Sequence, residues 1–154
     1  GYNVTQGDAF MALWASSNTP KSERHVNAVV QAALEISRGN PHRAVELLER
    51  AAPYELGPGT GCQYVLHVRG EAHLKAGSGN EAAAAFHKIL DHRGVFVGAP
   101  HYSLAWLGLG RAQALAGNTA AARKAYQDFL ATWKDADPDV PILKEAKQEY
   151  AKLK

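Results

Sequence analysis

One spacing recurs three times along the chain and limits its fold more than any other feature. Each copy has a glycine, an alanine five residues later, a bulky residue four residues after that, and a further helix-packing residue three positions on. The three copies are Gly39, Ala44, Leu48 and Ala51; Gly77, Ala82, Phe86 and Ile89; and Gly117, Ala122, Tyr126 and Phe129. Internal repetition of this kind indicates that one supersecondary unit has been stacked, rather than that one reactive site has been built.

Apolar residues recur at helical spacing on both sides of each glycine, and all seven prolines fall where helices are expected to start or stop. At the first junction, Gly39 can adopt the left-handed conformation that closes a helix. Asn40 can then cap the next helix, and Pro41 suits its first turn. The pattern predicts three helical hairpins within residues 21–134, at about 22–52, 62–91 and 101–133, and no strands.

The two ends of the chain are expected to differ from the repeats. Residues 1–20 predict a short helix that is the remnant of a preceding repeat, and the start at Gly1 without a methionine indicates an excised piece of a longer protein. Residues 140–154 predict an amphipathic helix that caps the array. Its expected apolar stripe is Ile142, Leu143, Ala146, Tyr150 and Leu153, with lysines and glutamates on the other side.

The connection at 92–100 is longer than a minimal turn and carries Val95, Phe96 and Val97. These side chains either tuck under the adjacent hairpin or form an exposed contact patch. We favour the first alternative, because large exposed apolar patches are uncommon.

Composition excludes several classes of function. The 17 basic and 15 acidic residues are mixed along the chain and leave a net charge of +2, which does not indicate a nucleic-acid partner. A single cysteine, Cys62, excludes an intrachain disulfide. No apolar run approaches the ~18 residues of a transmembrane helix, so we expect no membrane insertion. We expect a soluble domain, cytoplasmic or extracytoplasmic depending on its parent protein.

Three groups of reactive residue types could support chemistry: His87 with Asp91 and His92, Asp135 with Asp137 and Asp139, and Cys62 with His67. The first lacks a third metal ligand on its helix face. The second is interrupted by Pro138 and lacks the glycine and closing glutamate of a calcium loop. The thiol and imidazole of the third do not meet on a regular helix. We therefore expect no metal, no cofactor and no catalytic residue, and a metal-dependent enzyme is the least favoured alternative.

The third hairpin resembles a tetratricopeptide repeat, whose signature is Trp-x2-Leu-Gly-x2-Tyr followed by Ala-x3-Phe. Its matching residues are Trp106, Leu109, Gly110, Ala122 and Tyr126, with Gln113 in the tyrosine place. The second hairpin keeps Gly70, Ala82 and Phe86 but has Leu66, Arg69 and His73 at the other positions, and the first keeps Ala32, Ala44 and Leu48. The resemblance covers about 25–134. It implies an all-α, right-handed α–α superhelix of three hairpins with a C-terminal capping helix.

The same resemblance implies that the first helix of each hairpin lines a concave groove that binds a protein or peptide. By position, the residues expected to line it are Val29, Ala33, Ile36, Tyr64, His67, Glu71, Lys75, Leu107, Arg111 and Ala114. Tyr64 and Arg111 are the expected anchors, because aromatic and guanidinium groups often dominate binding energy. The lysine and asparagine clamp with which some members hold a terminal carboxylate is not reproduced.

Residues 40–153 also resemble the C-terminal repeat region of large bacterial signalling proteins, in which a serine/threonine protein kinase or a winged-helix domain precedes the repeats. The resembling segments are 43–48, 51–57, 89–94, 126–130 and 133–139. This implies a regulatory or scaffolding tail, and the chain itself has no kinase motif. The alternative is a structural array that self-associates and leaves its groove empty. Partner identity, parent architecture, membrane side and oligomeric state stay open.

Overall fold

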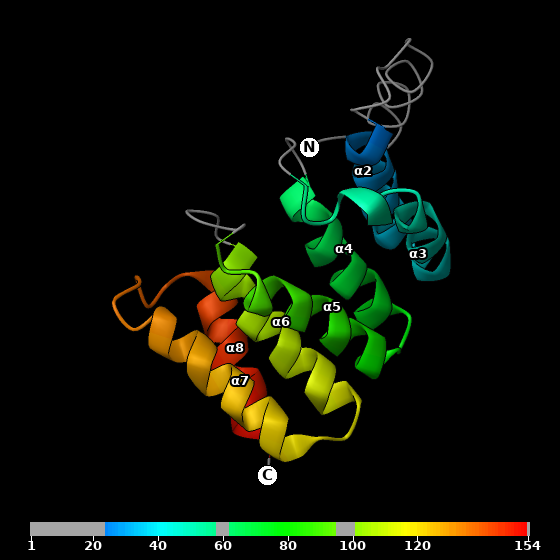
Figure 1. The fold of residues 1–154 in the computed structure, drawn as a ribbon. Helices are drawn as coiled ribbons and strands as arrows, with labels where there is room; N and C mark the ends of the chain where they lie inside the picture. Colours follow the sequence, from blue (N-terminus) through cyan, green and yellow to red (C-terminus); the bar gives the residue numbers. More distant parts are fainter. Residues whose placement is uncertain (1–23, 58–61, 95–100, 154) are drawn as a thin grey trace.

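The computed structural model describes residues 24–57, 62–94 and 101–153, and these residues form seven α-helices and one 3-10 helix without a strand. The helices are α2 (Arg24–Ser37), α3 (Pro41–Glu49), η2 (Ala52–Tyr54), α4 (Cys62–Lys75), α5 (Gly79–Asp91), α6 (His101–Leu115), α7 (Thr119–Thr132) and α8 (Pro141–Lys152) (Figure 1). The predicted all-α array of three hairpins and a final helix is confirmed. The helix expected within 1–20 and the segment 95–97 lie outside the described residues.

The hairpins stack in chain order. Helices α2 and α3, α4 and α5, and α6 and α7 pack as pairs, and the first helix of each later pair also contacts the pair before it (Figure 1). In the described ranges, none of the helices combines the length and the apolar character that crossing a membrane requires.

Each hairpin turns at a glycine with the expected left-handed conformation. The φ angles are 80° at Gly39, 78° at Gly77 and 80° at Gly117. At the first turn, the amide of Gly39 donates to the carbonyl of Ile36 and the amide of Asn40 donates to that of Glu35, and the other two turns repeat this pattern. Asn40 occupies the N-cap position of α3, as predicted, but its side chain makes no capping hydrogen bond, and its amide donates instead to the carboxylate of Glu35 at 2.9 Å.

A small residue on the first helix faces a bulky residue on the second, sixteen positions later, in the second and third hairpins. A Cβ added at Gly70 would lie 2.5 Å from the ring of Phe86, and one added at Gly110 would lie 2.8 Å from the ring of Tyr126. In the first hairpin, Ala32 and Leu48 occupy the same two positions, and both are fully buried. The repeated spacing in the sequence therefore encodes how closely the two helices of a hairpin approach.

The buried apolar residues form three clusters that share helices. One cluster joins α2, α3 and α4, the second joins α4, α5, α6 and α7, and the third joins α6, α7 and α8. Leu143 and Ala146 of α8 are buried in the third cluster, and the rest of the predicted stripe packs against it. Helices α4 and α6 each contribute to two clusters, so no hairpin has a core of its own.

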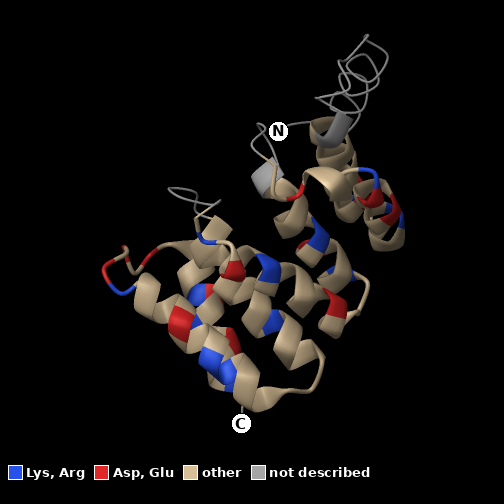
Figure 2. Cartoon of the chain, viewed as in Figure 1, with Lys and Arg blue, Asp and Glu red and all other residues tan. Residues whose placement is uncertain are grey.

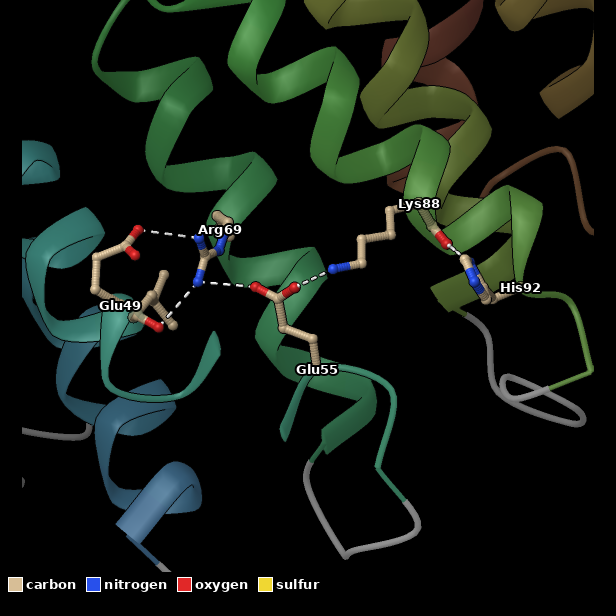
Figure 3. A network of polar contacts seen from close by, with 6 residues as sticks. Glu49, Glu55, Arg69, Lys88 and His92 are labelled. Atoms are coloured by element: carbon tan, nitrogen blue, oxygen red, sulfur yellow. Dashed lines mark hydrogen bonds and ion pairs between the residues drawn. The ribbon is translucent and has the colours of Figure 1, made fainter. Parts of the chain in front are cut away.

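The connection between the first two hairpins is held by a polar network (Figure 3). Arg69 of α4 lies 3.0 Å from the carboxylate of Glu49 and 2.8 Å from that of Glu55, and it donates to the carbonyl of Leu48 at 2.9 Å. Lys88 of α5 lies 2.6 Å from the other oxygen of Glu55. Arg69 stands where the tetratricopeptide signature has a leucine, so this departure has a structural reason: the arginine fastens the lengthened connection to the second hairpin.

Candidate functional site

The strongest candidate site is a cavity of about 470 Å³ between α4, α6 and α8. It is lined by Glu71, Leu74, Lys75, Arg111, Leu115, Glu145 and Glu149, and we call it the Glu71 cavity. All of its described lining residues come from the first helices of the second and third hairpins and from the final helix. Helices α4 and α6 are among those for which the sequence predicted a binding groove, whereas it predicted α8 only as a cap.

Arg111 is held at one side of the Glu71 cavity by the final helix. Its Nε and a terminal nitrogen donate to the two carboxylate oxygens of Glu149 at 2.9 and 3.0 Å, and a terminal nitrogen lies 3.5 Å from Glu145. The hydroxyl of Tyr126 also donates to Glu149, at 2.9 Å. Burial alone would raise the pKa of Glu149, but the hydrogen bonds from Arg111 and Tyr126 outweigh it and hold that pKa below its usual value.

Glu71 faces the same cavity without such a partner. Among the described residues, no side chain donates a hydrogen bond to its carboxylate or lies within ion-pair distance of it. Burial raises the pKa of Glu71, although the positive charges of Arg111 and Lys75 act in the opposite direction. The cavity therefore contains one carboxylate that is desolvated and not neutralised by direct contact.

The other predicted groove residues do not join this cavity. Val29 and Ile36 pack in the first apolar cluster, and Ala33 is exposed on α2. Ala114 is half-buried on α6 and does not line the cavity. Of the predicted residues, the cavity brings together Glu71, Lys75 and Arg111.

Tyr64 and His67 lie with His101 between α4 and α6. The ring centroids of Tyr64 and His101 are 4.4 Å apart, those of His67 and His101 are 5.3 Å apart, and both pairs meet edge to face. Burial, followed by repulsion from His101, lowers the pKa of His67 to about 4. Tyr64 is 42% exposed. Its ring is thus partly committed to packing and partly available to a partner.

Leu107 is not available to line a groove. It is 1% exposed and lies in the third cluster with Leu143 and Ala146, because α8 covers this part of α6. The sequence interpretation placed the glutamates of α8 on the side away from the array, whereas Glu149 reaches back to α6. The i, i+4 spacing of Glu145 and Glu149 marks a shared helix face, but it does not say toward which neighbour that face turns.

The described residues offer little for other chemistry. They contain no group of three histidine, cysteine, aspartate or glutamate side chains placed to hold a metal ion. The Nδ1 atom of His92 is within 2.8 Å of the carbonyl of Lys88, and Asp137 accepts a hydrogen bond from the amide of Asp139.

A second cavity of about 540 Å³, beside the first hairpin, is lined by Asn27, Ala28, Gln31, Leu47, Arg50 and Tyr54. Basic and acidic residues are interspersed over the described helices (Figure 2).

Helical hairpins that share their apolar clusters with their neighbours define an α–α repeat protein. In a comparison with family models, residues 67–141, from within α4 to the start of α8, match the family described as tetratricopeptide repeat. Searches of curated proteins and of solved structures found no significant match. Such repeats are generally protein-binding and typically non-catalytic.

Proposed function

We propose that this chain is a non-catalytic module that binds a protein or peptide segment along the face formed by α4, α6 and α8. The observation that carries the proposal is the Glu71 cavity on that face, whose lining combines charged groups with the leucines Leu74 and Leu115. Leu115 is 48% exposed there, so part of its apolar side chain is accessible to a partner. A concave surface that offers five charged groups beside two leucines can hold both the polar and the apolar side chains of a peptide.

The test begins with a selection of random twelve-residue peptides displayed on phage against the full chain. Enriched peptides are then synthesised with a fluorescent label, and their dissociation constants are measured by anisotropy. Leu115→Glu should weaken binding by more than about tenfold, because it places a charge where apolar side chains are expected to dock. Ala84→Glu is the matched control, since Ala84 is exposed on α5, which does not line the cavity.

Two results would overturn the proposal. One is the absence of any enriched peptide, and self-association of the chain in sedimentation would then favour the structural array instead. The other is binding that Leu115→Glu leaves unchanged. Arg111→Ala is a poor first variant, because it also removes the ion pairs that hold α8.

We further propose that the module is the regulatory or scaffolding tail of a bacterial signalling protein such as a serine/threonine protein kinase. The support is the resemblance of residues 40–153 to the repeat regions of such proteins. The sequence of the full-length gene tests this proposal. A kinase or winged-helix domain in the same reading frame would support it, and a parent of another class would overturn it.

A further inference from the structure

The charges of the Glu71 cavity do not balance. Its lining carries three carboxylates, on Glu71, Glu145 and Glu149, and two cations, on Lys75 and Arg111, which leaves one formal negative charge. Arg111 is already engaged by both carboxylates of α8, at 2.9 and 3.5 Å. Of the three carboxylates, Glu71 is the one without an ion pair or hydrogen bond among the described residues, and the ammonium of Lys75, one turn further along α4, acts on it only through space.

The apolar part of the lining fits the same kind of ligand. Leu74 is half-buried and Leu115 is largely exposed, and both border the cavity that Glu71 faces. Lysine and arginine side chains combine an aliphatic stem, which packs against apolar surface, with a cationic end group that pairs with a carboxylate. An acidic segment fits less well, because it would meet Glu71 and Glu145 and would have to displace Glu149 from Arg111.

We propose that the Glu71 cavity receives a lysine or arginine side chain of the bound segment, with Glu71 as its counter-ion and Leu74 and Leu115 against its stem. This inference rests on the proposed function and specifies the chemistry of the partner. The raised pKa of Glu71 is consistent with it, since a carboxylate desolvated without a direct partner gains most from an incoming cation.

The experiment uses the peptides enriched on the full chain in the selection described above. The expected peptides share a lysine or arginine at one position. For a lysine peptide, replacement of that residue by norleucine keeps the stem, removes the charge and should weaken binding about tenfold. Glu71→Gln should weaken binding of the original peptide by a similar factor. The norleucine peptide should bind Glu71→Gln about as tightly as it binds the wild type, because the two changes remove the same ion pair.

Glu46→Gln is the control variant, because Glu46 is exposed on α3 and lies outside the cavity. Glu71→Gln preserves the shape of the side chain, and circular dichroism should show that it folds as the wild type does. The peptide-side substitution tests the same ion pair without altering the protein.

The possible failures can be told apart. If Leu115→Glu abolishes binding while Glu71→Gln binds as tightly as the wild type, the module binds peptides but the basic-residue inference is wrong. Enriched peptides that share an acidic residue, or no charged residue, would also overturn it. If no peptide is enriched, or if Leu115→Glu has no effect, the proposed function fails and the inference fails with it.

Discussion

Phe86 is the residue on which the second and third hairpins meet. Its ring is fully buried and lies against Gly70 of its own hairpin and Gly108 of the next. The signature spacing identifies Gly70 as the partner of Phe86. It does not identify Gly108, because that contact depends on how α6 lies across α5 and not on a spacing within one hairpin.

Gly108→Ala should destabilise the protein. The added Cβ would overlap the ring of Phe86, and overpacking of this kind costs about 1–3 kcal/mol, against up to ~1 kcal/mol that alanine gains in helix propensity. Urea denaturation followed by circular dichroism measures the difference. Gly94→Ala is the matched control, since a Cβ there would meet nothing within 4 Å, and it should be nearly neutral. Equal stability of the two variants would show that the ring of Phe86 can move aside.

Among the elements, the described part of the connection between α3 and α4 shows how one side chain, that of Glu55 directly after η2, can fix a segment outside the α-helices. The side chain of Glu55 is 7% exposed and forms ion pairs with Arg69 and Lys88, which lie on the two helices of the second hairpin. Its position is therefore set by the helices it contacts and not by the local sequence around it (Figure 3).

Glu55→Ala should lower the free energy of unfolding by about 2–3 kcal/mol, because it removes the buried carboxylate beside Arg69 and leaves that largely buried guanidinium with only the exposed carboxylate of Glu49. Glu49→Ala removes the other carboxylate from the same arginine, but its side chain is 62% exposed, so the expected loss is under ~1 kcal/mol. Chemical denaturation of the two variants checks this ranking. A loss of the same size in both would mean that Glu55 contributes no more than a surface ion pair.

The sequence was most informative about elements and least informative about the contacts between them. Gly39, Gly77 and Gly117 marked the three turns because a left-handed conformation strongly favours glycine. The amphipathic stripe of α8 identified the side of this helix that packs against α6 and α7. The burial of Leu107 and the pairing of Glu149 with Arg111 could not be predicted in this way, since both depend on the angle at which α8 crosses α6.

For the whole molecule, acid is expected to weaken the stacking of α4 on α6. The pKa of His67 is about 4 in the folded protein and near 6.5 when exposed, so the unfolded chain takes up its proton first as the pH falls. The stability that the neutral imidazole supports is present above pH ~6.5 and is lost as the pH falls toward 4, by up to ~1.4 kcal/mol for each pH unit. Burial lowers the pKa of His101 as well, so its contribution has the same sign.

His67→Leu should reduce this acid sensitivity, because leucine already occupies the corresponding position of the third hairpin, at Leu107. Urea denaturation at pH 7.5 and pH 5 measures the change for the wild type and the variant. His87→Gln is the control, since His87 is exposed on α5 and takes no part in the contact between His67 and His101. A wild-type stability that is the same at both pH values would contradict the expectation.

The sharing of helices between apolar clusters has a consequence for whatever occupies the Glu71 cavity. The cavity is bordered by α4, α6 and α8, and α6 shares one apolar cluster with α4 and another with α8, so an occupant touches the second hairpin, the third hairpin and the final helix at once. Its binding energy therefore opposes separation of these three units from one another, and the ligand stabilises the stacking from α4 to α8.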